Sequence, residues 1–195
     1  MTSTPRLAVL GSGKGSNFLA IQEAIIAGKL DAQIVLVASD LPDAIILSKA
    51  AAFGLPTATL PPSPFRTKLS PEGEVALVEL LQKHAVEWVI LAGYMRVVKE
   101  PLLSAFSNRI INIHPSLLPA FKGLRAWEQA LTAGVPETGC TVHFVNRDID
   151  AGEIIAQCRV PILPGDTPET LHARIQIAEH ELYPSALAKV FRKAV

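Results

Sequence analysis

The sequence of residues 7–28 is LAVLGSGKGSNFLAIQEAIIAG, a short apolar run followed by a glycine-rich loop and an amphipathic segment. The unbroken apolar run Leu7–Leu10 predicts a buried strand. Apolar residues at helical spacing over Asn17–Ala27, with Gly28 directly after them, predict a helix and its C-terminal cap. A fully apolar strand that leads through glycines into a helix is typical of a parallel α/β sheet.

The same alternation continues through the first two thirds of the chain. Strands are expected at Ile34–Ala38, Thr57–Leu60, Val86–Leu91 and Arg109–Ile113, and helices at Ala44–Phe53, at Glu72–His84 and from about Pro101. Ser70 and Pro71 are suited to the cap and the first position of the second of these helices. Repeated units of strand, helix and strand imply a parallel sheet with helices on both faces.

After about residue 135 the pattern changes. Cys140–Val145 and Glu153–Val160 are strand-like runs joined by a turn-rich link, which predicts an antiparallel extension. A long terminal helix is expected from Thr167 to about Val190. The predicted fold class is therefore α/β: a Rossmann-like, mostly parallel sheet flanked by helices, with a C-terminal antiparallel extension and a long terminal helix. The length fits one domain over residues 1–195.

Composition narrows the classes of function. Lys plus Arg and Asp plus Glu number 18 each, so the formal net charge is +0 and binding along a nucleic-acid backbone is not expected. No apolar stretch reaches the roughly 18 to 20 residues of a membrane span. The start Met1–Arg6 lacks the features of a signal peptide, so a cytoplasmic protein is expected.

Cysteine and metal chemistry are not expected to contribute. Cys140 and Cys158 lie in apolar, strand-like surroundings, so they are interpreted as small buried hydrophobic residues rather than as a disulfide or a catalytic pair. No cluster of His, Cys and acidic residues has the spacing of metal ligands. His84, at the end of a predicted helix, and His143, which alternates along a predicted strand, are interpreted as structural.

The glycine loop of residues 11–17 is a candidate phosphate site. Glycines let the backbone approach a ligand closely, and the helix that follows offers free N–H groups to an anion. The spacing of the glycines fits neither the dinucleotide fingerprint nor the P-loop, although Asp40 near the end of the second strand leaves dinucleotide binding open as an alternative. Ser16 and Asn17 are better suited to binding one terminal phosphate than a pyrophosphate. The alternative, that the glycines serve only the geometry of a turn, stays open.

The segment around Asn112 and His114 carries the candidate chemistry. Residues two apart in a strand point to the same face, and this strand ends where α/β sheets place ligands. A structural His–Asn pair is the alternative. The turn that contains Asp148 and Asp150 could bring an acid to His114. Asn112 and His114 can then stabilise an oxyanion. Asp150 can orient His114 and accept a proton from an attacking amine. Asp148 is of a residue type that favours turns and can serve the geometry of the turn.

Four segments in this order resemble the phosphoribosylglycinamide formyltransferase family. They are Gly13-Lys14-Gly15-Ser16-Asn17, Leu91-Ala92-Gly93-Tyr94-Met95-Arg96, Asn112-Ile113-His114-Pro115-Ser116-Leu117-Leu118-Pro119 and Asp150-Ala151-Gly152. The third is shared by the broader formyltransferase group, whereas the glycine loop and the segment from Phe121 to Leu131 narrow the resemblance to the purine-pathway members. The similarity runs from the first strand to Ala178-Glu179-His180 in the last helix.

The resemblance implies that a formyl group passes from 10-formyltetrahydrofolate to glycinamide ribonucleotide by direct attack of the amine, without a metal or a covalent enzyme intermediate. Asn112, His114 and Asp150 would carry the chemistry. The acceptor site would comprise Gly15, Ser16, Asn17, Gln176 and Glu179. The folate site would comprise Met95, Arg96, Val98 and the backbone around Ile149, with a basic residue from the loop after the third strand, for which Lys68 is the candidate and Arg66 the alternative. The resemblance leaves monomer and homodimer both open.

One position departs from the family pattern. Two residues before Gln129, where the family has a histidine, the chain has Trp127, preceded two positions earlier by Arg125. The departure concerns the rim of the site rather than the reaction, and Trp127 is interpreted as a residue of a helix core.

Three other functions could use parts of the same sequence pattern. A formyltetrahydrofolate deformylase would use the same three polar residues with water in place of the amine, but such enzymes resemble the chain without this glycine loop and carry a further N-terminal domain. The enzyme that formylates initiator tRNA is longer and more basic. A non-catalytic nucleotide-binding module would explain the glycine loop but not Asn112, His114 and Asp150.

Overall fold

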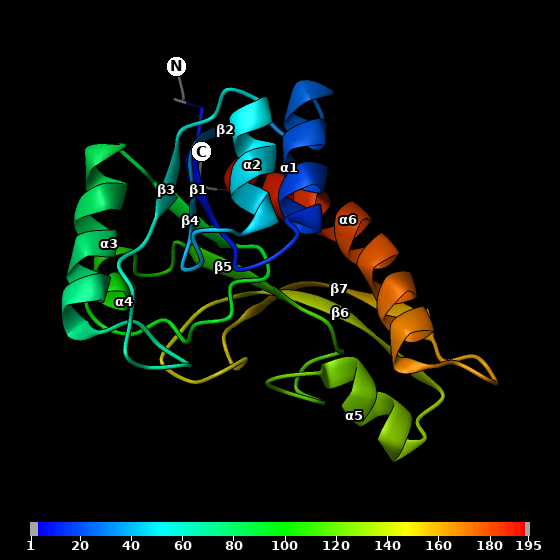
Figure 1. Ribbon diagram of the computed structural model, residues 1–195. Coiled ribbons are helices and arrows are strands. Elements are labelled where there is room, and N and C mark those ends of the chain that lie inside the picture. Colours follow the sequence, from blue (N-terminus) through cyan, green and yellow to red (C-terminus); the bar gives the residue numbers. More distant parts are fainter. Residues whose placement is uncertain (1–3, 194–195) are drawn as a thin grey trace.

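The computed structural model describes residues 4–193, which are built around one seven-stranded sheet with the order β3-β2-β1-β4-β5-β6-β7 (Figure 1). The strands are β1 (Arg6–Leu10), β2 (Gln33–Ser39), β3 (Thr57–Thr59), β4 (Trp88–Leu91), β5 (Ile110–His114), β6 (Glu137–Phe144) and β7 (Ile154–Pro161). The helices are α1 (Ser16–Ile26), α2 (Ile45–Ala52), α3 (Pro71–Lys83), α4 (Leu102–Ala105), α5 (Ala126–Ala133) and α6 (Pro168–Lys193).

The first five strands pair in parallel, and the last two form an antiparallel extension. β1 lies between β2 and β4, and β5 pairs in parallel with β4. On its other side β5 pairs antiparallel with β6, which in turn pairs antiparallel with β7. The predicted fold class is confirmed.

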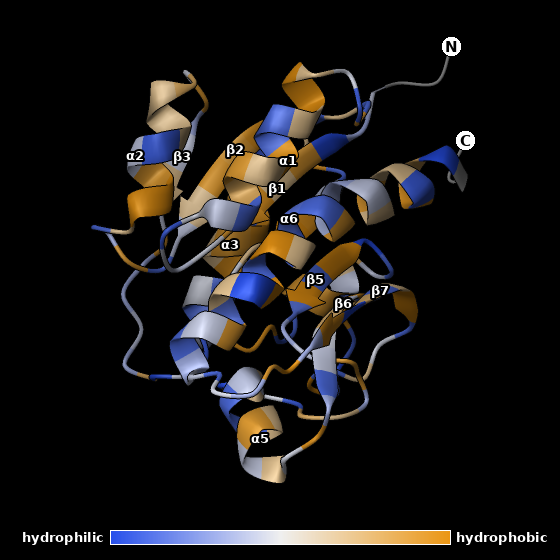
Figure 2. Ribbon diagram, turned by 90° about the vertical axis from the view of Figure 1, so that its right-hand side faces the viewer, coloured by the Kyte–Doolittle hydropathy of each residue, from blue (hydrophilic) through white to orange (hydrophobic). Residues whose placement is uncertain are grey.

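Alternate residues of β1 belong to two different cores, one on each face of the sheet. Leu7 and Val9 pack in the core that α1, α2 and α6 cover, whereas Ala8 and Leu10 pack in the core beneath α3 and α4. Because both faces of the strand are buried, every position must be apolar. Figure 2 shows β1 and its neighbour β2 largely in the orange of hydrophobic residues, and the helices packed on them carry hydrophilic residues on their outer faces.

The ends of the helices follow local sequence signals. The Ser70 hydroxyl accepts a hydrogen bond from the Gly73 N–H at 3.1 Å, and Pro71 opens α3, as predicted. Gly28 follows α1 with φ of 68°, a left-handed conformation that glycine adopts without steric cost. Both signals act within one helical turn, so the sequence alone was sufficient to locate them.

Several boundaries differ from the prediction because backbone hydrogen bonds decide them. Val86 was expected in β4, but its N–H bonds to the Leu81 carbonyl of α3, and the strand begins at Trp88. His114 was expected just beyond β5 and instead belongs to the strand, where it is the partner of Thr141 in β6. No bounds were predicted for α5, the helix that carries Trp127.

Tyr183 fastens α6 to the sheet. Its side chain is fully buried, and its hydroxyl lies 3.0 Å from the carbonyl oxygens of both Leu91 and Ile111. These carbonyls belong to β4 and β5, so the middle of the helix is held over two neighbouring strands. Glu179 lies one helical turn earlier and therefore faces the same edge of the sheet.

The order of the strands reverses between β1 and β4. From β1 the chain proceeds outward to β2 and β3, and it then returns to the other side of β1 to form β4. The loops that leave these two strands meet, since the Ser12 N–H donates to the Gly93 carbonyl at 3.0 Å. Open α/β sheets bind ligands outside the carboxyl ends of the strands at such a point.

Candidate active site

Asn112 and His114 lie two residues apart on β5, at the end of the strand that faces the candidate ligand edge. Their Cα partners in β6 are His143 and Thr141. His114 is buried and Asn112 is half-buried. The structure confirms that the two side chains share one face of the strand.

Asp150 reaches His114 from the loop between β6 and β7. Its Oδ2 atom lies 3.3 Å from His114 Nδ1 and accepts a hydrogen bond from the Gly123 N–H at 2.8 Å. Asp150 has φ of 48°, a left-handed conformation that Asp tolerates better than most residues. The predicted proximity of Asp150 and His114 is confirmed. The exposed Asp148 instead takes part in the turn through its N–H, which donates to Asn146 Oδ1 at 3.0 Å.

The hydrogen bonds of His114 constrain its proton. His114 Nε2 lies 2.9 Å from the Phe121 carbonyl oxygen, which can only accept, so Nε2 must carry a hydrogen. Nδ1 then faces a carboxylate oxygen, and this contact is attractive only when a proton lies on one of the two atoms. Nε2 of His114 therefore donates to the Phe121 carbonyl, and Nδ1 faces the Asp150 carboxylate.

His143 is the residue of this cluster that sequence reasoning missed, because it was interpreted as structural. Its Nδ1 donates to the Phe144 carbonyl at 2.8 Å, so Nε2 of the neutral ring accepts from the Asn112 side-chain amide at 3.2 Å. Burial lowers the pKa of His143 and favours this neutral form. Its Nε2 also lies 3.7 Å from Asp150 Oδ1. Only the register of β5 with β6 could have revealed that these residues meet.

The glycine loop after β1 has two positions that the fold itself requires to be glycine. Gly15 is the N-cap of α1 with φ of 68°, and a Cβ atom there would lie 2.8 Å from the Ile46 side chain. A Cβ on Gly11 would lie 2.8 Å from the Ala92 carbonyl oxygen, whereas one on Gly13 would meet no atom within 4 Å. The geometry of the turn therefore accounts for Gly11 and Gly15 but not for Gly13.

Asn17 and Glu179, both predicted in the acceptor site, contact each other across 162 positions of sequence. The Asn17 Nδ2 atom donates to Glu179 Oε2 at 2.8 Å, and both side chains are buried. Burial raises the pKa of Glu179 to about 7, and the hydrogen bond from Asn17 opposes the rise. Asn17 Oδ1 has no partner among the described residues. Gln176 lies three positions before Glu179 and shares its side of α6.

A groove of about 1120 Å³ between α1 and α6 is distinct from this cluster. It is lined by Ser16 at one end and by Lys29 and Arg192 among other residues, but not by Asn112, His114 or Asp150. The candidate chemistry thus lies at the carboxyl edge of the sheet rather than in the groove.

The predicted folate residues lie on three loops at the same edge. Met95 and Arg96 follow β4 and Val98 is buried behind them, while Ile149 is exposed directly before Asp150. Lys68 and Arg66 are exposed on the loop after β3, with the Lys68 ammonium 4.5 Å from the centre of the Phe65 ring. The Arg96 guanidinium is turned inward and pairs with Asp40 at 2.6 Å.

Trp127, the departure from the family pattern, lies between two helices. Its ring stacks on the His172 imidazole with centroids 3.8 Å apart and an interplanar angle of 7°. It is half-buried against the core beneath α6, which agrees with the interpretation as a packing residue. Arg125 is exposed and pairs with Glu128 at 3.3 Å.

The remaining candidates for chemistry do not join the site. Cys140 and Cys158 are free thiols on paired positions of β6 and β7; Cys140 is buried and Cys158 half-buried, and burial raises the pKa of the Cys140 thiol to about 12. Within the described part of the chain, no group of three or more His, Cys, Asp or Glu side chains could hold a metal ion. No helix between residues 4 and 193 has both the length and the apolar character needed to cross a membrane.

Comparison with known proteins agrees with this arrangement. The sequence is 44% identical over 190 residues to the bovine (Bos taurus) trifunctional purine biosynthetic protein adenosine-3, covering 97% of this chain and 19% of that protein. It is 43% identical over 185 residues to the phosphoribosylglycinamide formyltransferase of Bacillus subtilis, covering 95% of this chain and 94% of the relative. The chain thus spans about a fifth of the first relative and nearly all of the second.

A solved structure and a family pattern extend the comparison. The crystal structure of phosphoribosylglycinamide formyltransferase from Bacillus halodurans superposes with a TM-score of 0.91 at 43% identity, covering 97% of both chains. Residues 5–187 match the formyl transferase family. This match includes the glycine loop, β5 and the turn that carries Asp150, so the chain belongs to the formyl transferase family.

Proposed function

We propose that the chain transfers the formyl group of 10-formyltetrahydrofolate to the amine of glycinamide ribonucleotide, a reaction of de novo purine biosynthesis. The names of the B. subtilis and B. halodurans relatives support this acceptor, because the chain matches both over nearly their whole lengths. The observation that carries the proposal is the cluster of Asn112, His114 and Asp150, with His114 and Asp150 3.3 Å apart at the ligand edge of the sheet.

In the proposed reaction the amine attacks the formyl carbon, a new C–N bond forms, and the carbonyl electrons move to oxygen. The old C–N bond then breaks, and the folate nitrogen leaves with a proton. One Asn112 N–H is directed to His143, so its second N–H is available to the oxyanion. Asp150 accepts the proton that the amine loses, directly or through a water molecule.

His114 has to exchange one hydrogen bond in this mechanism. Its Nε2 hydrogen is directed to the Phe121 carbonyl, and the same hydrogen would stabilise the oxyanion. The Gly123 N–H of the same segment is bonded to Asp150. A small displacement of residues 121–123 would therefore release His114 and Asp150 together.

We assign the acceptor phosphate to Gly15, Ser16 and Asn17. The N-terminus of α1 supplies free N–H groups and the positive end of the helix dipole, and both attract a phosphate. Gln176 and Glu179 face the remainder of the acceptor from α6. Asn17 Oδ1, which has no partner within residues 4–193, offers a buried hydrogen-bond acceptor beside them.

We assign the formyl donor to the loops around Met95, Arg96 and Val98 and to the backbone near Ile149. Apolar side chains of the first loop can pack against a planar ring system. Lys68, with Arg66 as the alternative, supplies a positive charge for the carboxylates of the folate tail.

The test is a mass-spectrometric assay with 10-formyltetrahydrofolate, with and without glycinamide ribonucleotide. Formylated ribonucleotide that forms only when both substrates are present supports the transferase. Formate produced equally well without the ribonucleotide would establish a deformylase. Binding of both substrates without any product would establish a non-catalytic binding module.

The wider assignment follows the same proposal. We propose a single formyltransferase domain over residues 1–195 that acts in the cytoplasm on small molecules, as a monomer or a homodimer. The balance of 18 basic and 18 acidic residues supports small anionic substrates over a nucleic acid.

A further inference from the structure

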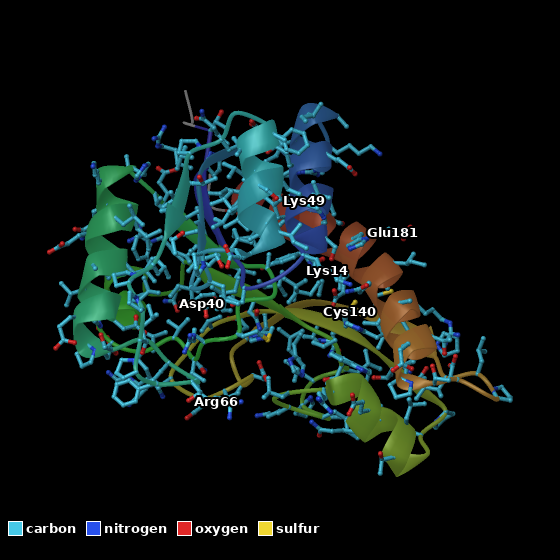
Figure 3. All side chains as sticks on the ribbon, viewed as in Figure 1. Lys14, Asp40, Lys49, Arg66, Cys140 and Glu181 are labelled. Atoms are coloured by element: carbon cyan, nitrogen blue, oxygen red, sulfur yellow. The ribbon has the colours of Figure 1, made fainter. Side chains whose placement is uncertain are left out.

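Asp40 is a buried carboxylate that the catalytic proposal does not use. It directly follows β2, and its side chain is 4% exposed. In Figure 3 it lies just beyond the ends of the parallel strands, on the side of the molecule where Arg66 also lies. A charge in this position requires partners, because burial without them is costly.

Both oxygens of Asp40 are occupied by side chains from neighbouring loops. Oδ1 accepts from the Ser12 hydroxyl at 2.5 Å, and Oδ2 accepts from Arg96 Nε at 2.6 Å. The Ser12 oxygen in turn accepts from the Met95 N–H at 2.9 Å. Since Met95 and Arg96 are adjacent, these bonds form a closed ring that begins and ends on the loop after β4. A carboxylate held in this way is not free to bind a ribose, which argues against the dinucleotide alternative.

The ring also extends to the loop after β3. Arg96 Nη1 donates to the Phe65 carbonyl, and the Val97 N–H donates to the Thr67 carbonyl at 2.7 Å. Lys68 is the next residue of that loop. Asp40 therefore orients the Arg96 guanidinium, and through it two of the loops that we assign to the formyl donor.

The glycine loop has supports of its own. The Gly11 N–H donates to the Ala38 carbonyl at 3.1 Å, and the Ile46 N–H donates to the Gly13 carbonyl at 3.0 Å. Neither bond uses a side chain or the loop after β4. The loop assigned to the acceptor phosphate should consequently keep its place when the Asp40 carboxylate is removed.

We infer that Asp40 is a positioning residue for the formyl donor, acting through Arg96 and Ser12 on the loops around Met95 and Lys68. This inference rests on the proposed function, because it takes those loops as the folate site. It predicts that loss of the carboxylate changes the Michaelis constants of the two substrates unequally. A general loss of stability would not have this effect.

The experiment compares Asp40→Ala with the wild type and with Asp43→Ala, a variant of an exposed carboxylate in the loop that follows Asp40. In Asp40→Ala the Michaelis constant for 10-formyltetrahydrofolate should rise about tenfold, as expected for the loss of hydrogen bonds to a charged group. The Michaelis constant for the ribonucleotide should change by less than about twofold. Asp43→Ala should leave both constants unchanged. Equal changes for the two substrates, or a lower melting temperature with both constants unchanged, would overturn the inference.

Two further measurements separate this inference from other failures. In a double-mutant cycle, Ser12→Ala should add little to the change that Asp40→Ala makes in the Michaelis constant for the folate, because both act through one ring. Fully additive effects would contradict that ring.

If Asp40→Ala does not fold, Asp40→Asn keeps the side-chain shape and loses the charge. It should show the same unequal change in the two Michaelis constants. If the wild type shows no formyl transfer, the proposed function fails, and calorimetric titration of Asp40→Asn and wild type with tetrahydrofolate still tests Asp40: equal affinities would refute its role.

Discussion

The parallel and antiparallel halves of the sheet build their parts of the candidate site in different ways. In the parallel half, the glycine loop and the Met95 loop follow directly after β1 and β4, and backbone groups supply many of the contacts. In the antiparallel half, Asn112 and His143 meet because β5 and β6 pair in one register. A shift of one residue would turn these side chains to opposite faces. The first half is thus encoded locally, and the second depends on long-range pairing.

The largest effect is expected at the antiparallel end, for Asp150→Asn. The variant keeps the shape of the side chain and an acceptor for the Gly123 N–H but loses the proton acceptor, so kcat should fall about 10²- to 10⁴-fold. Steady-state kinetics and circular dichroism would measure activity and fold together. Asp148→Asn, at an exposed position of the same turn, is the matched control and should keep its activity. Near-normal turnover of Asp150→Asn would remove Asp150 from the mechanism.

A smaller loss of turnover is expected for His143→Ala, which tests the pairing of the strands. Without the His143 ring the Asn112 amide loses the acceptor that orients it, and a misplaced catalytic group can cost about 10²-fold in kcat. His84→Ala is the control, because His84 is the C-cap of α3 and its side-chain Nδ1 lies 2.9 Å from the Leu80 carbonyl of the same helix. If both variants keep the wild-type kcat, His143 is structural, as the sequence had indicated.

Within the parallel half, Gly15→Ala and Gly13→Ala form a matched pair. Alanine at position 15 would combine a left-handed backbone with a contact of 2.8 Å to Ile46, so the free energy of unfolding should fall by about 1–3 kcal/mol. The Cβ of alanine at position 13 meets no atom within 4 Å, so this variant should change the free energy of unfolding by less than about 0.5 kcal/mol. Urea denaturation measures the free energy of unfolding of both variants. Equal destabilisation by the two substitutions would show that the loop is not held by the contact with Ile46.

The smallest effect is expected from Glu179→Gln, which probes the contact between α1 and α6. Burial raises the pKa of Glu179 to about 7 from an ordinary value of 4.5, so its ionisation costs stability as the pH rises through this interval. Glutamine does not ionise and can still accept from Asn17. Relative to wild type, the variant should therefore gain about 1–2 kcal/mol of stability between pH 6 and pH 8.

The control for this pH dependence is Glu181→Gln, an exposed position two residues further along α6. Thermal denaturation at several pH values compares the two variants. A parallel pH dependence of wild type and Glu179→Gln would mean that Glu179 does not titrate in this range.

The sequence predicted the parts of the fold that depend on short stretches of chain. The apolar run Leu7–Leu10, the cap at Ser70 and the glycine after α1 were located correctly, because each signal acts over a few neighbouring residues. The start of β4 was misplaced, since Val86 bonds back to α3 rather than to a strand. Helix α5 was given no bounds, although its residue Trp127 was assigned to a helix.

By itself the sequence also determined the residue types of the site and the strand that carries two of them. Asn112 and His114 are two residues apart, and alternation along a strand is enough to place them on one face. Only the tertiary structure decided that His143 contacts Asn112, that Asn17 contacts Glu179, and that Asp40 contacts both Ser12 and Arg96. The physical reason is that these contacts depend on strand order, register and the packing of α6, and these features are set by the burial of two cores at once rather than by local propensity.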